Sequence, residues 1–142
     1  MMKLKVFIAD DSRLIRERLV EMLLPINGIQ IIGQTGDGIE AETLILKKQP
    51  DVVIMDIRMP GKNGVKVLQA IKKQKPYIKI IIITNYPFPV YKKVCMEEGA
   101  DFFFDKTDGF EAITAVLDRW KYELEYISVN KKLKCLLKHA CN

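Results

Sequence analysis

The segment Val52-Val-Ile-Met-Asp56 is a continuous apolar run that ends at a carboxylate, and Ile80-Ile-Ile-Ile-Thr84 repeats the arrangement with a hydroxyl at its end. A strand with one face in water alternates apolar and polar residues, whereas a strand that is covered on both faces is apolar throughout. These two runs therefore predict central strands of a parallel sheet with helices on both faces.

Strand-like and helical patterns alternate along the rest of the chain. We expect strands at residues 3–9, 29–34, 51–55, 78–83 and 100–104, and helices at residues 14–23, 37–48, 64–73, 90–98 and from 110 onward. Parallel strands need a crossover of about a dozen residues or more, which is usually a helix. The alternation predicts a doubly wound α/β domain whose five-stranded parallel sheet has the order 2-1-3-4-5.

The composition is that of one globular domain with a tail, because 142 residues are 49% hydrophobic and 29% charged. The apolar runs are shorter than the roughly 20 residues of a membrane span, and the first ten residues lack a signal-peptide pattern. Cys95, Cys135 and Cys141 form no CxxC pair, which argues against a disulfide framework. We expect a cytoplasmic protein without a transmembrane segment.

Polar side chains follow four of the five predicted strands, at the sheet edge where ligands of such folds bind. Asp10 and Asp11 follow the first strand, Asp56 the third, Thr84 the fourth and Lys106 the fifth. Three carboxylates at one edge repel one another unless a cation neutralises them, and oxygen ligands suit Mg²⁺. A carboxylate in such a site can act as a nucleophile and form an aspartyl phosphate, while the lysine and the hydroxyl contact phosphoryl oxygens.

From residue 4 to about 125 the chain resembles a response-regulator receiver domain. The resemblance rests on Ile8-Ala-Asp-Asp-Ser12, Val53-Ile-Met-Asp-Ile-Arg-Met-Pro-Gly-Lys-Asn-Gly64, Ile82-Ile-Thr84 and Gly99-Ala-Asp-Phe-Phe-Phe-Asp-Lys106. It implies a flavodoxin-like receiver fold and a phosphoprotein of a two-component system or phosphorelay. Asp56 would be the phosphoacceptor.

The same resemblance implies a metal site. Asp11 and Asp56 would ligate Mg²⁺ directly, together with the backbone carbonyl of Arg58, and Asp10 would orient metal-bound water. Lys106 would contact the phosphoryl group.

The resemblance also implies a switch, formed by Thr84 and by Phe103, the aromatic residue three positions before Lys106. Thr84 would move toward the phosphoryl group and the Phe103 ring would rotate inward behind it. This would reshape the face made by the fourth helix, the fifth strand and the fifth helix. Ordinary core packing is the alternative reading of Phe103.

The residue after the switch threonine is usually small in this family, but here it is Asn85, followed by Tyr86. Arg58 and Tyr86 lie where side chains could gate the attacking water. We therefore predict slower dephosphorylation than in a fast-cycling chemotaxis regulator.

The basic character of the chain lies at its C-terminal end, where residues 119–142 carry +4 of the net charge of +5. We place the receiver domain at residues 1–127 and a basic tail at residues 128–142. The tail is either a frayed, solvated end or a weakly amphipathic helix that folds back on the domain or serves a partner. Self-association through the tail, which would give a homodimer, is a further alternative.

A DNA-binding effector would need about 60 more residues, so we expect a single-domain response regulator that signals by protein contact. Its partners would be a sensor histidine kinase or a histidine phosphotransfer protein, and an unidentified output protein. We do not expect an enzyme with a separate substrate. The alternative is phosphorylation-controlled nucleic-acid binding through the basic tail, for which clustered lysines without interleaved aromatic residues are weak support.

Overall fold

The computed structural model describes residues 2–140, so Met1, Cys141 and Asn142 at the end of the predicted tail lie outside the described residues. Five strands and five helices alternate. The strands are β1 (Leu4–Ala9), β2 (Ile29–Thr35), β3 (Val52–Met55), β4 (Lys79–Thr84) and β5 (Phe102–Asp105). The helices are α1 (Arg13–Leu23), α2 (Gly38–Lys48), α3 (Gly64–Gln74), α4 (Pro89–Glu97) and α5 (Gly109–Ala140).

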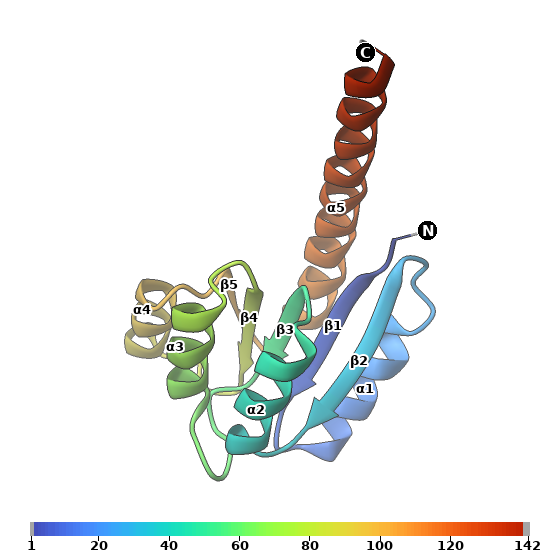
Figure 1. Ribbon diagram of the computed structural model, residues 1–142. Coiled ribbons are helices and arrows are strands. Elements are labelled where there is room, and N and C mark those ends of the chain that lie inside the picture. The colour runs from blue at the N-terminus through green and yellow to red at the C-terminus, as the bar shows by residue number, and fades with distance from the viewer. Residues whose placement is uncertain (1, 141–142) are drawn as a thin grey trace.

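All strand pairs are parallel and the strand order is β2-β1-β3-β4-β5, which confirms the predicted fold class and topology. Helices α1 and α5 cover one face of the sheet, and α2, α3 and α4 cover the other (Figure 1). Alternate residues of each central strand enter opposite cores. Val6 and Ile8 belong to the core under α1 and α5, whereas Phe7 and Ala9 belong to the other.

Strand β2 extends further than the sequence indicated, because we predicted a strand that ended at residue 34. It runs through Thr35, with a register shift between Val6 and Phe7 of β1. Gly33 lies inside the strand because the Phe7 ring fills the space of a side chain there, 2.8 Å from where a Cβ would lie. The carbonyl of Thr35 accepts a hydrogen bond from the Asp10 amide at 3.0 Å, so β2 helps to position the first aspartate.

Side-chain caps fix the starts of three helices at the carboxyl edge of the sheet. The Ser12 hydroxyl, the Asp37 carboxylate and the Asn63 amide oxygen accept hydrogen bonds from backbone amides in the first turns of α1, α2 and α3. Such caps satisfy backbone donors that a helix start would otherwise leave unpaired. The loops after β1, β2 and β3 are therefore anchored where each of them enters its helix.

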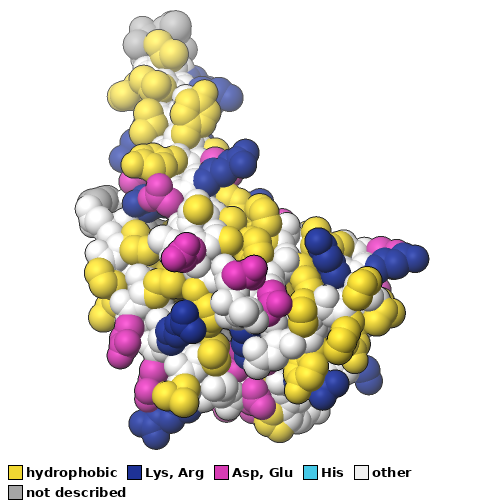
Figure 2. Space-filling view, turned by 180° about the vertical axis from the view of Figure 1, so that it is seen from behind, with side chains coloured by type: hydrophobic (Ala, Val, Ile, Leu, Met, Phe, Trp, Pro, Cys, Tyr) yellow, Lys and Arg dark blue, Asp and Glu magenta, His cyan; other side chains and the backbone are white. Residues whose placement is uncertain are grey.

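Helix α5 is continuous through residue 127, where we placed the end of the domain, so no break in the helix marks that limit. It runs along the sheet and then projects beyond it as an isolated helix, which corrects the hypothesis of a tail folded back on the domain (Figure 1). Figure 2 shows hydrophobic and basic side chains along the projecting part. Within residues 2–140 no helix combines the length and the apolarity that crossing a membrane requires.

Candidate metal centre

Three aspartates meet at the carboxyl edge of the sheet. Asp10 directly follows β1 and Asp56 directly follows β3, and these strands are neighbours with Ala9 paired to Met55. One carboxylate oxygen each of Asp10, Asp11 and Asp56 lies within 4.8 Å of the others. Asp10 and Asp56 are buried, whereas Asp11 is exposed, so the cluster opens to solvent on the Asp11 side.

Lys106 supplies the positive charge of the site. Its ammonium nitrogen lies 2.7 Å from Oδ2 of Asp10 and 2.9 Å from Oδ2 of Asp56. Lys106 directly follows β5, which β4 separates from β3 and from the Asp56 that follows it. The backbone amide of Lys106 donates to the Thr84 carbonyl at 2.9 Å. All three charged groups are buried.

The charges at this edge shift two pKa values. Burial raises the pKa of Asp10, and the nearby charge of Asp56 adds to this, against the opposing effects of Lys106 and the Ser12 amide. Burial alone would lower the pKa of Lys106, but its contacts with Asp10 and Asp56 outweigh burial and raise it. Lys106 therefore stays protonated, and one cation faces three carboxylates.

The oxygen atoms of the cluster fit a hard cation. Oδ1 of Asp56 accepts from the Ile57 amide at 2.7 Å and Oδ1 of Asp10 accepts from the Ser12 amide at 2.9 Å, which fixes both carboxylates. Oδ2 of Asp10 is buried and has no hydrogen-bond donor, because its contact with Lys106 is an ion pair without hydrogen-bond geometry. An all-oxygen set with an unsatisfied buried carboxylate oxygen is suited to Mg²⁺.

The loop after Asp56 folds closely back on that residue. The Gly64 amide donates to the Ile57 carbonyl at 2.6 Å. A Cβ on Gly64 would lie 2.1 Å from the Asp56 carbonyl oxygen, so only glycine allows this approach. The start of α3 therefore holds the backbone of Asp56 in place.

The two predicted switch residues lie on neighbouring strands. Thr84 is fully buried at the end of β4, and its hydroxyl oxygen accepts from the Tyr86 amide at 3.0 Å. Phe103 pairs with Ile82 and packs, half-buried, against the core under α3 and α4. Tyr91 of α4 packs against the same core. Thr84 and Phe103 thus lie on paired strands, and the switch itself stays a prediction.

Two of the three predicted gating residues are in contact. The guanidinium carbon of Arg58 lies 3.8 Å from the centre of the Tyr86 ring. Arg58 and Asn85 are exposed and Tyr86 is half-buried. The contact connects the loop that follows Asp56 with the loop that follows Thr84.

Sequence reasoning missed Arg16. Its guanidinium donates to the carbonyl oxygen of Asp10 at 2.6 Å, so α1 holds the backbone of the first aspartate from the other side of the loop. Arg16 lies one turn after the Ser12 cap, but Arg13 and Arg18 carry the same charge on either side of it in the sequence. What distinguishes Arg16 from them is the side of α1 on which it lies, and the sequence pattern does not give that orientation.

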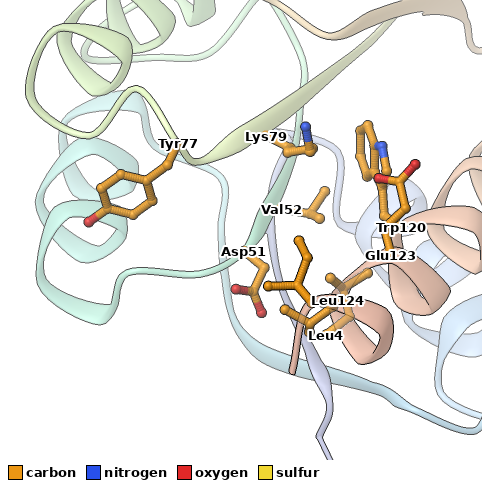
Figure 3. A pocket seen from close by; sticks show the side chains of 9 residues that line it. Leu4, Asp51, Val52, Tyr77, Lys79, Trp120, Glu123 and Leu124 are labelled. Atoms are coloured by element: carbon orange, nitrogen blue, oxygen red, sulfur yellow. The ribbon is translucent and has the colours of Figure 1, made fainter. Parts of the chain in front are cut away.

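A groove of about 220 Å³ lies at the opposite edge of the sheet, where β1, β3 and β4 begin. Figure 3 shows Trp120 and Leu124 of α5 beside Leu4 and Val52. The groove has a mainly apolar lining and lies where α5 leaves the sheet. The groove is separate from the aspartate cluster.

Comparisons of sequence place the chain beside bacterial regulators. The profile of the response regulator receiver domain matches residues 6–118. The response regulator GacA of Pseudomonas aeruginosa is 32% identical over 128 residues, which cover 88% of this chain and 58% of that protein. The transcriptional regulatory protein YvfU of Bacillus subtilis is 37% identical over 97 residues, covering 68% of this chain and 48% of that protein. The chain thus spans about half the length of these relatives.

Solved structures give the same result. The signal receiver domain of NarL from Mycobacterium tuberculosis superposes with a TM-score of 0.75 at 28% identity, covering 83% of this chain and 98% of that one. The receiver domain of AraT from Geobacillus stearothermophilus superposes with a TM-score of 0.77 at 27% identity, and the match covers 89% of this chain and 99% of that one.

Proposed function

The chain belongs to the response regulator receiver domain family, and from this we propose that Asp56 accepts a phosphoryl group from a phosphohistidine of a kinase or phosphotransfer protein. One observation carries the proposal. Lys106 contacts both Asp10 and Asp56 at the carboxyl edge of the sheet, with Asp11 beside them. A buried nucleophile, a fixed cation and an open acidic set are the groups that phosphoryl transfer to a carboxylate requires.

We place the metal on the same side chains. Asp11 and Asp56 would ligate Mg²⁺ with the backbone carbonyl of Arg58, and Asp10 would hold it through a water. The ion would offset the negative charge of the phosphoryl oxygens. The charge balance of the cluster supports this assignment, because three carboxylates share the single ammonium group of Lys106, and a divalent cation would offset the remaining negative charge.

The transfer itself would use the oxygen of Asp56 that faces Lys106. Oδ1 of Asp56 accepts from the Ile57 amide, which leaves Oδ2 on the side of Lys106 as the attacking atom. As Oδ2 bonds to phosphorus, the P–N bond of the donor breaks, and the imidazole leaves with its electron pair. Lys106 then neutralises a phosphoryl oxygen instead of the carboxylate. Hydrolysis by water later restores Asp56 and releases inorganic phosphate.

Signalling would follow from a change in the Lys106 and Thr84 contacts. In this structure the Thr84 hydroxyl oxygen accepts from the Tyr86 amide and is free to donate its proton. A phosphoryl oxygen on Asp56 would attract that donor, and the half-buried Phe103 ring could fill the space behind it. The face of α4, β5 and α5 would then favour one of two arrangements, which is how a local charge change biases a switch.

We propose that this face contacts an output protein, and that the chain is a phosphoacceptor rather than an enzyme with a separate substrate. The stand-alone arrangement and nucleic-acid binding by the tail stay predictions, because the chain spans about half the length of the relatives it matches. Gating of hydrolysis by Arg58, Asn85 and Tyr86 belongs to the same proposal.

Intact mass after incubation with acetyl phosphate tests the proposed phosphorylation. Wild type should gain one phosphoryl group only with Mg²⁺ present, and Asp56→Asn should gain none. Glu21→Gln, an exposed carboxylate on α1, is the matched control and should behave as wild type. Absence of an adduct with acetyl phosphate and with any phosphohistidine donor, or an adduct that persists in Asp56→Asn, would contradict the assignment.

A further inference from the structure

Helix α5 carries a second apolar stripe that its own domain does not cover. The stripe consists of Tyr122, Tyr126, Val129, Leu133 and Leu136, and we call these five residues the outer seam. Their exposed fractions run from 50% to 69%. Large apolar side chains that are exposed singly need no explanation, but a contiguous row marks a contact surface.

The outer seam lies on the side of α5 that faces away from the sheet. Ile113, Leu117 and Trp120 are buried against β1 and β4, and Leu124 continues this inner stripe. At 3.6 residues per turn each residue advances by about 100°, which puts Tyr122 and Tyr126 roughly half a turn from the inner stripe. Figure 3 shows Trp120 and Leu124 directed to the start of the sheet. The domain packs against the opposite side of α5 and therefore cannot bury the outer seam.

The spacing of the outer seam is that of a helix pair. Its residues follow one another at intervals of four, three, four and three, an average of 3.5. A repeat of 3.5 residues keeps one apolar row against a second helix along its whole length. A second copy of this chain carries the same row and can therefore supply the second helix.

The charges of the projecting part select one direction for the pair. Within residues 122–140, both glutamates lie at the beginning, at positions 123 and 125, and the four lysines follow at positions 131, 132, 134 and 138. A parallel pair would bring lysines beside lysines and glutamates beside glutamates. An antiparallel pair brings the acidic part of each helix beside the basic part of the other. Glu125 and Lys132 lie seven residues apart and flank the seam on the same side of the helix. In an antiparallel pair, Glu125 of each chain would therefore face Lys132 of the other chain.

We propose that the outer seam binds the same segment of a second copy of this chain, in antiparallel orientation. The order of the seam residues fits this arrangement. If the two helices are related by symmetry about a point between residues 127 and 128, Tyr126 packs against Val129 of the other chain, and Tyr122 packs against Leu133. The contact would use residues outside the α4, β5 and inner α5 surface that we assign to signalling. It therefore stands whether or not Asp56 is phosphorylated.

Sedimentation of the full chain over a wide range of concentrations tests the contact. Wild type should have the mass of a dimer, and Leu133→Glu should have the mass of a monomer, because the change buries a charge in the seam. Cys135→Glu adds the same charge in the same turn on the opposite side of the helix and should remain a dimer. Unchanged phosphorylation of Leu133→Glu by acetyl phosphate would show that its domain is intact. A wild type that stays monomeric at every concentration, or equal masses for the two variants, would overturn the proposal.

Disulfide formation tests the direction. In a chain with Cys135→Ser and Cys141→Ser, mixed Tyr122→Cys and Leu133→Cys proteins should form a disulfide between unlike chains, which intact mass identifies. Two copies of either variant would hold their thiols about 16 Å apart, since eleven residues at 1.5 Å separate them along the axis. Disulfides between like chains alone would indicate a parallel pair and overturn the antiparallel assignment. Cys95 is buried and should not interfere.

Discussion

The guanidinium of Arg58 stacks on the ring of Tyr86, with 3.8 Å between the guanidinium carbon and the ring centre. Arg58 lies two residues after Asp56, and the Tyr86 amide donates to the hydroxyl oxygen of Thr84. One side-chain contact thus connects the loops that carry the proposed phosphoacceptor and the proposed switch threonine. Opening it would change access to Asp56 from both loops at once.

We expect Arg58→Ala and Tyr86→Ala each to speed loss of the phosphoryl group by about 2- to 5-fold. An exposed cation–π contact is worth about 0.5–1 kcal/mol, and about 1.4 kcal/mol corresponds to a tenfold change in rate. The double variant should lose the phosphoryl group at the rate of the faster single variant, because both substitutions remove the same contact. Decay of the intact-mass adduct measures this. Tyr77→Ala, at the other edge of the sheet, is the control, and an unchanged rate in the double variant would remove the gating idea.

Mg²⁺ should stabilise the wild type against unfolding, and Asp11→Asn should lose most of this effect. A ligand at 100 times its dissociation constant stabilises the folded state by about 2.7 kcal/mol. Without metal, Asp11→Asn should be the more stable protein, because one of three clustered carboxylates is then neutral. Thermal unfolding with EDTA and with Mg²⁺ measures both effects. A metal-free Asp11→Asn that is less stable than wild type would contradict the repulsion on which the site assignment depends.

The fold could be predicted because two apolar runs, at residues 52–55 and 80–83, leave little choice. Strands of this kind must be covered on both faces, and the helical segments between them are the crossovers that parallel strands need. The aspartates and Lys106 could be predicted for the same reason, since the carboxyl ends of parallel strands meet at one edge. The sequence pattern was therefore sufficient to predict those site residues that the sheet topology itself brings together.

Other features depend on directions that a linear pattern does not contain. The hydrogen bond from Arg16 to Asp10 requires the rotation of α1 about its own axis, and the stacking of Arg58 on Tyr86 requires the paths of two loops. Gly33 stays in a strand only because the Phe7 ring replaces its missing side chain. The outer seam of α5 was obscured because two apolar stripes on opposite sides of one helix cancel in any search for an amphipathic face.

Gly64→Ala should destabilise the domain and impair phosphorylation together. The added Cβ would lie 2.1 Å from the carbonyl oxygen of Asp56, so either α3 or the Asp56 backbone must move. Overpacking of this kind costs about 1–3 kcal/mol or more. Urea unfolding and acetyl phosphate labelling measure the two effects. Lys66→Ala, on the exposed side of the same helix, should change neither, and a fully stable Gly64→Ala would show that the loop can shift freely.

The thiol of Cys95 should be inert in the folded protein, and its ionisation should oppose folding at high pH. Burial raises the pKa of Cys95 from 9.0 to about 11. The unfolded chain therefore loses this proton first, so the contribution is present below pH 9 and is lost as pH rises toward 11. The difference in free energy of unfolding between wild type and Cys95→Ala should narrow over this range. In a Cys141→Ser chain at pH 8, a thiol reagent should modify exposed Cys135 at once and Cys95 only after unfolding. Rapid modification of both would show that the core under α4 opens readily, because a closed core gives a reagent no access to the thiol.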